Sequence, residues 1–237
     1  MRPGALVTRP LADSQGLAEA LEARGFAPLI EPMLTIRFLD TAPPEHDAYQ
    51  AVLATSANGV RALARLVPWR DLPVWAVGDA SAREARNLGF VTVHSAAGDV
   101  ASLADLVSER AERTKGPLLH VAASRLAGDL AGALASSGFS VEKVVLYEAE
   151  PADDLSPELI AALAEEHLDI ALFFSPRTAA TFARLVKKAD LGESLRRIKA
   201  LALSAAVAET LSPLPWRGVE QAERPDQAAL LARLDGE

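Results

Sequence analysis

Short apolar runs alternate with longer segments rich in alanine, leucine, arginine and glutamate along almost the whole chain. The apolar runs have the length of buried strands, and the longer segments carry apolar residues at helical spacing. Strands that alternate with helices are typical of parallel sheets whose crossover connections are helices. The pattern therefore predicts an α/β fold made of parallel sheets flanked by helices.

These patterns, with the turn residues between them, place the individual elements. The strands are predicted near residues 4–8, 27–30, 51–54, 74–77, 91–93, 117–121, 141–145, 169–174, 199–203 and 219–221. The helices are predicted near residues 12–24, 58–66, 80–88, 100–112, 125–136, 156–165, 177–187, 205–211 and 226–234. Gly25 and Gly138 each stand between a helix and a strand, where the left-handed conformation open to glycine closes a helix.

The chain also repeats itself in a weak form, because similar segments occur in the same order in its two halves. The pairs are LAEALEARGF (17–26) with LAGALASSGF (130–139), LATSANGVRALARL (53–66) with LFFSPRTAATFARL (172–185), and DVASLADLV (99–107) with DQAALLARL (226–234). The alternative is a chance likeness between alanine-rich helices. We interpret residues 1–115 and 116–237 as two degenerate copies of one α/β unit, which predicts two similar lobes.

Two extended-looking stretches with proline at an edge connect the predicted lobes. They are EPMLTIRF (31–38) and VVLYEAEP (144–151). The chain would leave the first lobe through one stretch and return to it through the other. We therefore expect a discontinuous first lobe of residues 1–35 and 152–237, a second lobe of residues 40–146, and linkers at residues 36–39 and 147–151.

Composition limits the classes of protein that remain. Of the 237 residues, 50% are apolar and 24% charged, which is the balance of a globular protein with a sizeable core. No apolar run is long enough for a membrane span, and we expect no signal peptide. Because the chain has no cysteine, thiol chemistry is excluded and a cytoplasmic location is expected. The net charge of −8 opposes binding to nucleic acid or anionic membranes, so an anionic ligand needs a locally positive site.

Several strand-to-helix turns carry small polar residues or arginine. In parallel sheets, ligands bind beyond the carboxyl ends of the strands, where helix N-termini present free N–H groups and partial positive charge. The candidates for an anion-binding surface at these turns are Thr8, Arg9, Thr55, Ser56, Asn58, Gly78, Arg125, Ser175, Arg177 and Ser204. Arginine adds bidentate hydrogen bonds to carboxylate or phosphate. The alternative is that the polar side chains are only helix N-caps and the arginines ordinary surface residues.

Motifs for other chemistries are missing from the sequence. The histidines His46, His94, His120 and His167 have no metal-ligand spacing, so we expect no metal site, and we expect each of them at the surface or at a strand end. The G-x-S-x-G, Walker and G-x-G-x-x-G motifs do not occur. Their absence disfavours covalent hydrolysis, nucleotide hydrolysis and dinucleotide chemistry.

A set of segments spread over almost the whole chain is recognisable when its members are taken in order. They are LVTRP (6–10), LATSANGV (53–60), AVGDASA (76–82), a strand that ends in Tyr147, LFFSPRTAATF (172–182), LSAAVAETL (203–211) and AERPDQAALLARL (222–234). In order and spacing, this set resembles the uroporphyrinogen-III synthase family. The chain departs from that family at LSAAVAETL, where Ala205 and Ala206 stand in place of the glycine and threonines of many members, which removes a hydroxyl role there.

The resemblance implies a two-domain α/β fold and a hydro-lyase of porphyrin and heme biosynthesis. The family removes water from hydroxymethylbilane, a linear tetrapyrrole with eight carboxylates, and closes the ring with inversion of ring D to give uroporphyrinogen III. No cofactor or metal is implied. Such a substrate ionises readily, so the protein mainly has to fold and orient it, and a catalytic triad is not needed.

The resemblance also implies roles for particular residues. The turn candidates named above, Arg125 and Arg177 included, would hold the substrate's carboxylates, and Tyr147 would be a general acid for the departing hydroxyl. The alternative for Tyr147 is aromatic packing between the connector strands. We expect a monomer that contacts the preceding pathway enzyme at most transiently, with no nucleic-acid or membrane partner. The competing hypothesis is a non-catalytic bilobal protein that binds a small ligand.

Overall fold

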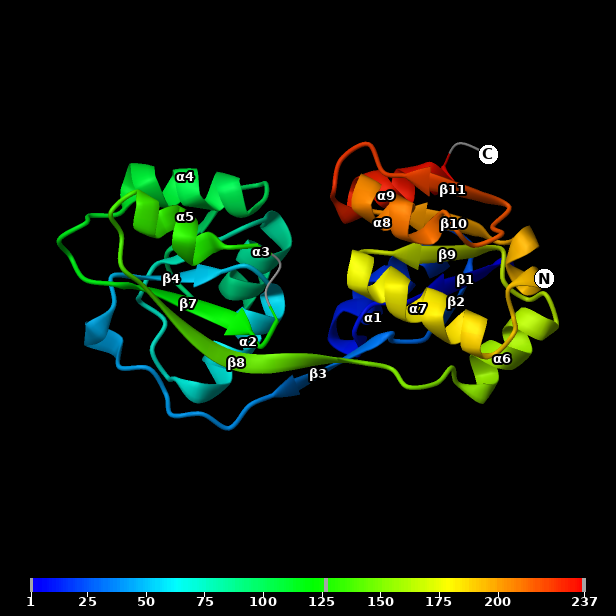
Figure 1. Ribbon diagram of the computed structural model, residues 1–237, viewed down its shortest axis with the longest axis horizontal. Coiled ribbons are helices and arrows are strands. Elements are labelled where there is room, and N and C mark those ends of the chain that lie inside the picture. Colours follow the sequence, from blue (N-terminus) through cyan, green and yellow to red (C-terminus); the bar gives the residue numbers. More distant parts are fainter. Residues whose placement is uncertain (1, 126–127, 236–237) are drawn as a thin grey trace. The chain divides into compact units, whose positions relative to one another are not determined.

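The computed structural model describes residues 2–125 and 128–235 (Figure 1). The chain forms two compact units. The first unit consists of residues 1–35 and 150–237, and the second unit consists of residues 36–149. The boundaries fall inside two strands, β3 (Leu34–Phe38) and β8 (Val141–Pro151). Both ends of the chain therefore belong to the first unit.

The first unit is built on a parallel sheet. Its strands, in spatial order, are β11 (Gly218–Gln221), β10 (Lys199–Ala202), β9 (Ile170–Phe173), β1 (Gly4–Val7) and β2 (Ala27–Ile30). Every neighbouring pair in this sheet is parallel. In the pair of β1 with β9, Ala5 lies opposite Ile170 and Val7 lies opposite Leu172. This pairing joins the two chain segments that the second unit separates in the sequence.

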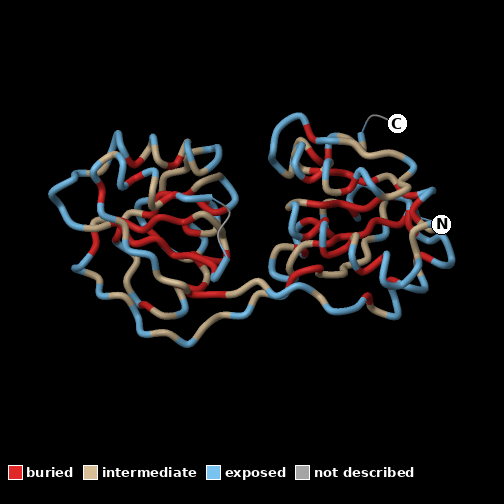
Figure 2. Tube along the Cα trace, viewed as in Figure 1, coloured by how far each residue is buried: buried red, intermediate tan, exposed pale blue. Residues whose placement is uncertain are grey.

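Helices cover both faces of the first sheet, and the central strands β1, β9 and β10 between them are mostly buried (Figures 1 and 2). One face carries α6 (Pro157–Ala164), α7 (Pro176–Lys188) and α8 (Ala205–Leu211), with the 3₁₀ helix η2 (Glu193–Arg197). The other carries α1 (Leu11–Glu22) and α9 (Gln227–Leu231), which continues as the 3₁₀ helix η3 (Ala232–Leu234). Leu6 packs on the first face and Val7 on the second, because side chains alternate along a strand. Burial on both faces explains why the central strands β1 and β9 are apolar throughout, whereas the edge strand β11 is partly exposed and carries Glu220 and Gln221.

The second unit contains a larger sheet. Its strands, in spatial order, are β3, β8, β7 (Leu118–Ala123), β4 (Ala51–Ala54), β5 (Val74–Ala76) and β6 (Val93–Ser95). The pairs from β8 to β6 are all parallel. The register of β7 against β8 shifts between Ala122 and Ala123, which marks a β-bulge close to the carboxyl end of β7.

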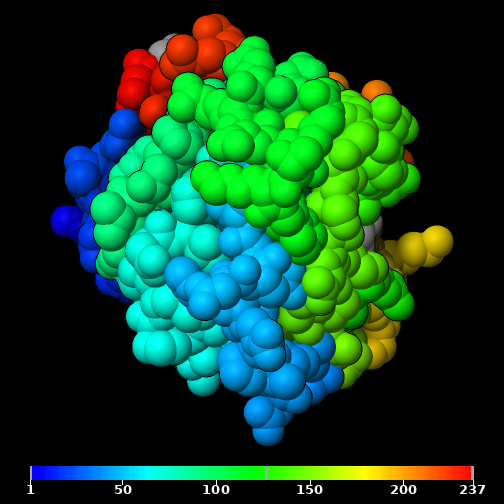
Figure 3. All heavy atoms as spheres, turned by 90° about the vertical axis from the view of Figure 1, so that its left-hand side faces the viewer, coloured from blue at the N-terminus to red at the C-terminus, as the bar shows by residue number. Residues whose placement is uncertain are grey.

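Helices also cover both faces of the second sheet. One face carries α2 (Ala57–Leu66) and α3 (Asp79–Asn87), and the other carries α4 (Val100–Arg110) and α5 (Leu130–Ser136). The 3₁₀ helix η1 (His46–Ala48) precedes β4. Figure 3 shows the end of this unit where β4 and β7 begin, with the light-blue chain before β4 beside the green chain before β7. The side chain of Gln50 joins these two segments through hydrogen bonds to Glu112 and Gly116.

The two sheets have the same order of strands, but each unit takes its strands from both halves of the chain. The order β11, β10, β9, β1, β2 of the first unit corresponds to β6, β5, β4, β7, β8 of the second. The two repeats, residues 1–115 and 116–237, therefore do not each form one unit. Each unit instead combines strands from both repeats, which corrects the interpretation that each repeat makes one lobe. In both copies the corresponding helix, α1 or α5, ends in the same way. The backbone N–H of Phe26 donates to the carbonyl oxygen of Leu21, and that of Phe139 donates to the carbonyl oxygen of Leu134.

The structure confirms the predicted α/β fold with parallel sheets flanked by helices. It also confirms the left-handed glycines, since φ is +86° at Gly25 and +82° at Gly138. Residues 34–38 lie in one of the extended stretches expected to connect the lobes, and they form β3 beside β8 in the second sheet, a strand that the sequence pattern does not predict. The predicted start of the helix 125–136 is too early, because α5 begins at Leu130 with Asp129 as its cap. Residues 126–127 of that prediction lie outside the described residues.

The contact of β1 with the chain before β9 leaves no room for a side chain at Gly4. A Cβ atom there would lie 1.9 Å from the carbonyl oxygen of His167. We expect Gly4→Ala to push the two strands apart and to lower the free energy of unfolding by about 1–3 kcal/mol or more. Urea unfolding followed by circular dichroism measures this loss.

Gly16→Ala is the matched control. Gly16 lies in α1, and a Cβ atom there would meet nothing within 4 Å. Alanine should raise the free energy of unfolding by about 0.5–1 kcal/mol at this position, since glycine is the poorer helix former. A Gly4→Ala variant as stable as the wild type would show that β1 and β9 are not in contact as described.

Candidate functional site

The strand-to-helix turns of the first unit meet at one edge of its sheet. β1, β9 and β10 are neighbours and parallel, so the residues that follow them lie at the same edge. This arrangement brings together Thr8, Arg9, Ser175, Arg177 and Ser204. The edge also holds the N-termini of α7 and α8, which begin directly after Ser175 and Ser204.

Ser175 and Ser204 differ in how they cap the start of the helix that follows them. The Ser175 side chain accepts a hydrogen bond from the backbone N–H of Thr178 at 3.1 Å, and its hydroxyl lies 2.7 Å from the Thr178 hydroxyl. Ser204 stands at the same position before α8, but its side chain makes no capping hydrogen bond. The capping alternative therefore describes Ser175 and not Ser204. Arg177, in the first turn of α7, is exposed.

Thr8 and Arg9 are anchored within the first unit. Thr8 is fully buried, and its hydroxyl donates to the carbonyl oxygen of Leu172 at 2.6 Å. Its proton is therefore committed to the pairing of β1 with β9. The guanidinium of Arg9 donates to Gln227 at 2.9 Å and lies over the ring of Phe174 at 4.4 Å from its centroid. Arg9 is thus the better placed of the two for an anion, since its charge is held at the edge in a fixed orientation.

The second unit has an equivalent edge after β4, β5 and β7. Thr55 and Ser56 follow β4, and the Ser56 side chain caps α2 by accepting from the N–H of Asn58 at 3.1 Å. Asn58 is mostly buried, and its side-chain oxygen accepts from Arg61 at 2.9 Å. Gly78 caps α3 with extended backbone, and among the described residues no atom besides those of its chain neighbours lies within 4 Å of the place where a Cβ would stand. A glycine at this position has no side chain that could cap the first N–H groups of α3.

Arg125 does not stand at a helix start. It is exposed, and five positions separate it from Leu130, where α5 begins. The prediction that Arg125 adds charge to a helix N-terminus is therefore wrong in its geometry. A role for Arg125 in binding substrate stays a prediction based on its position after β7.

Tyr147 lies inside the second unit on β8. Tyr147 is 6% exposed and belongs to the apolar cluster beneath α2, which also contains Val60, Leu63 and Leu146. Its backbone carbonyl accepts from the N–H of Ser124 at 3.0 Å. This packing agrees with the alternative of an aromatic residue between strands, while the acid role stays a prediction.

His120 is the polar residue that the sequence pattern placed wrongly. The pattern predicts it at the surface or at a strand end, but it lies in the middle of β7 and is 2% exposed. Burial, and to a lesser extent the charge of Lys143, lowers the pKa of His120 to about 4. A signal was present in the sequence, since a single histidine interrupts the apolar run LLHVAA (118–123).

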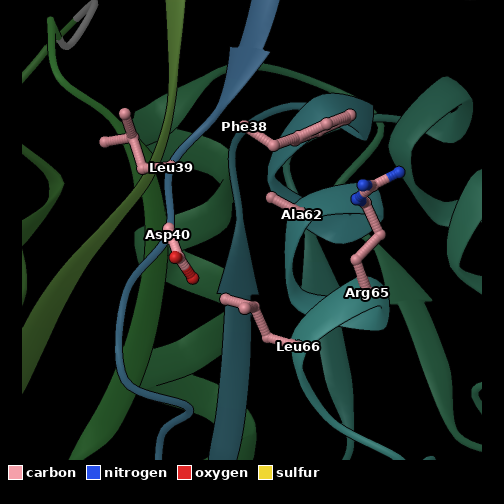
Figure 4. A pocket seen from close by; sticks show the side chains of 6 residues that line it. All are labelled: Phe38, Leu39, Asp40, Ala62, Arg65 and Leu66. Atoms are coloured by element: carbon pink, nitrogen blue, oxygen red, sulfur yellow. The ribbon is translucent and has the colours of Figure 1, made fainter.

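A hollow of about 420 Å³ lies on the second unit, beside the second half of α2 (Figure 4). It is lined by Phe38, Leu39, Asp40, Ala62, Arg65 and Leu66. The guanidinium of Arg65 lies over the ring of Phe38 at 4.9 Å from its centroid. Because Ala62, Arg65 and Leu66 belong to the second half of α2, the hollow is remote from the N-terminus of that helix. None of the predicted site residues lines it.

The described residues contain neither a cluster of metal ligands nor a membrane-spanning helix. Within residues 2–125 and 128–235, no group of three or more His, Cys, Asp or Glu could hold a metal ion. In the same part of the chain, no helix has the length and apolar character that a membrane crossing requires.

The protein is thus an α/β protein with two units, each built on a sheet with parallel strands. In each unit, helix N-termini and small polar residues lie at the carboxyl ends of these strands. A family model described as Uroporphyrinogen-III synthase HemD matches residues 15–232. The chain belongs to the uroporphyrinogen-III synthase family, whose members are lyases of heme biosynthesis. The match covers almost all of the chain and confirms the resemblance seen in the sequence.

Solved structures agree with this fold. The uroporphyrinogen-III synthetase from Helicobacter pylori 26695 matches with a TM-score of 0.67 and 16% identity, over 99% of this chain and 98% of that chain. A mutant uroporphyrinogen III synthase from the extremely thermophilic bacterium Thermus thermophilus matches with a TM-score of 0.56 and 23% identity, over the same shares. At these identities the likeness supports the fold alone. No curated protein matches the chain.

The buried His120 makes stability depend on pH. Its pKa is about 4 in the folded chain and about 6.5 when unfolded, so between these values only the unfolded chain binds the proton. This contribution to stability is complete above about pH 6.5 and is lost as the pH falls toward 4. We expect wild type to lose about 2 kcal/mol more than His120→Gln between pH 7.5 and pH 5.0, because the variant lacks the titrating ring.

Urea unfolding of both proteins at the two pH values measures the difference. His94, whose pKa burial also lowers, is present in both proteins and cancels in the comparison. Equal losses in wild type and variant would show that His120 is not buried in its neutral form.

Proposed function

We propose that this chain is a uroporphyrinogen-III synthase that acts on hydroxymethylbilane. It removes the ring-A hydroxyl as water and closes the linear tetrapyrrole with inversion of ring D, which gives uroporphyrinogen III. The observation that carries the proposal is the family match over residues 15–232. Membership in a family of lyases also favours this function over the alternative of a non-catalytic bilobal protein that binds a small ligand.

The geometry of the two edges supports binding of a polycarboxylate. α2, α3 and α7 each begin directly after a strand of a parallel sheet, so their first N–H groups and positive dipole ends stand at the edge. The substrate carries eight carboxylates, while the chain has a net charge of −8. Because the overall charges repel, binding must come from local groups such as these helix N-termini and Arg9.

We assign the edge residues to the substrate's acetate and propionate groups. In the first unit these are Thr8, Arg9, Ser175, Arg177 and Ser204, and in the second unit they are Thr55, Ser56, Asn58, Gly78 and Arg125. Ser204 is the most open hydroxyl of the set, since it makes no capping hydrogen bond. Thr8 cannot donate its hydroxyl proton to a carboxylate, because that proton is hydrogen-bonded to the carbonyl oxygen of Leu172. Its role in this proposal is to fix the turn that carries Arg9.

The reaction needs orientation more than acid or base strength. An electron-rich pyrrole expels the hydroxyl as water and leaves a cation at the methylene carbon of ring A. The substituted carbon of ring D then has to attack this cation to close the ring. Holding the two ends of a flexible chain in place can supply an effective molarity of roughly 10⁵ M or more. Fixed N–H groups that grip the carboxylates are suited to this task, because they position the substrate without reacting with it.

We further propose that the two compact units are the predicted lobes. Residues 1–35 with 152–237 would be the first lobe, 40–146 the second, and 36–39 with 147–151 the linkers, parts of which form β3 and β8. We also propose a cytoplasmic monomer that meets the preceding enzyme of the pathway only transiently. The lack of cysteine supports this location.

The isomer of the product tests the function. Purified protein is supplied with hydroxymethylbilane generated in situ, and the products are oxidised and separated by chromatography. We expect uroporphyrinogen III in the presence of the chain and the spontaneous type I isomer in its absence. Type I isomer alone in both reactions would contradict the proposal and favour the ligand-binding alternative.

Tyr147→Phe tests the proposed general acid. Loss of the phenol should slow turnover roughly 10-fold or more without abolishing it, because the substrate still ionises unaided. Stopped reactions at saturating substrate measure the change in kcat.

Tyr49→Phe is the matched control for this experiment. It removes the hydroxyl of the other tyrosine, which is equally buried but precedes β4 at the opposite end of the sheet. Its kcat should equal that of wild type. A fully active Tyr147→Phe enzyme would remove the acid role and leave Tyr147 as a packing residue.

A further inference from the structure

A buried histidine lies just beneath the carboxyl edge of the second unit and has no part in the roles proposed above. His120 stands between Leu53 of β4 and Lys143 of β8 in the register of the sheet. Thr55 follows Leu53 by two residues, so His120 and Thr55 face the same side of the sheet. That side is the apolar face covered by α4 and α5.

The two ring nitrogens of His120 have different surroundings. Nε2 lies 3.3 Å from the hydroxyl oxygen of Thr55. Nδ1 is buried and has no hydrogen-bond partner among residues 2–125 and 128–235. The ring carries a single N–H at neutral pH, because its pKa is about 4. A buried N–H without an acceptor is the costlier defect, so the proton belongs on Nε2, where Thr55 accepts it.

This tautomer decides what the Thr55 hydroxyl can do. A hydroxyl that accepts a hydrogen bond from His120 keeps its own proton for another acceptor. Thr55 is half-buried at the end of β4, directly before Ser56, the cap of α2. Within the described part of the chain, its hydroxyl has no partner besides His120.

We propose that His120 is a positioning residue that donates from Nε2 to the Thr55 hydroxyl and thereby directs the proton of Thr55 to a carboxylate oxygen of the substrate. His120 itself does not touch the substrate. The inference rests on the proposed function, because it takes Thr55 to be a substrate contact. It adds to that function a defined donor at one carboxylate of the tetrapyrrole.

Two amide substitutions separate positioning from packing. The amide nitrogen of glutamine reaches the place of Nε2, whereas that of asparagine reaches only the place of Nδ1. We expect His120→Gln to keep kcat/KM within about twofold of wild type and His120→Asn to lower it about 5- to 10-fold, the effect of one lost hydrogen bond. Both variants bury one amide, so a purely structural role predicts similar losses in both, and that result would overturn the inference.

The Thr55→Val background tests whether His120 acts through Thr55. Thr55→Val should lower kcat/KM as much as His120→Asn does, and the double variant should show no further loss. Additive losses would show that His120 and Thr55 act independently and would overturn the inference. Thermal unfolding of each variant confirms that the comparison is made between folded proteins.

The tautomer can be measured on the wild type without any substrate. Long-range ¹H–¹⁵N correlation spectra at pH 7.5 distinguish Nε2–H from Nδ1–H, and the His120 signals are those that His120→Gln lacks. The inference requires Nε2–H, and finding Nδ1–H would overturn it whatever the activities are. Wild type that yields only the type I isomer would instead overturn the proposed function, so the two failures are distinguishable.

Discussion

The pairing of β1 with β9 is the interaction on which the first unit depends. It joins residues near the start of the chain to a strand that begins at Ile170, with the whole second unit between them in the sequence. Gly4 fits against the carbonyl of His167 and donates to Asp169 at 2.8 Å, and Thr8 donates to Leu172 at the other end of the pair. Without this pairing, α1 and β2 would have no sheet to cover or extend, and the cluster around Leu17 would be exposed.

The same parallel pairing produces the candidate site. Because neighbouring strands run in one direction, every turn into a following helix reaches the same edge, and the binding groups proposed there are mostly backbone N–H groups. Such a site needs few specialised side chains. This explains why the edge carries the small N-cap residues Ser56, Ser175 and Gly78 and no catalytic triad. The side chains with fixed geometry, Arg9 over Phe174 and Thr55 beside His120, are held by neighbours within their own unit.

The parts of this structure that local pattern controls could be predicted, and the parts that tertiary contacts control could not. Buried parallel strands and glycine-ended helices leave a mark on the sequence, as at Gly25, and the edge turns follow from them. The stretch containing β3 has no such mark, because its pairing with β8 is a long-range event. The start of α5 follows the Asp129 cap, which a continuous helical period conceals. His120 was misplaced because a polar residue inside an apolar run is usually read as a strand end.

The exchange of parts between the two repeats has a consequence for the order in which the protein is made. On the ribosome, β1 and α1 emerge before the second unit, and β9 follows only after the second unit is complete. At about 5–20 residues per second, the N-terminal segment waits roughly ten to thirty seconds for its partner strand. The second unit can therefore fold while the edge of β1 that later pairs with β9 still has unpaired backbone N–H and C=O groups.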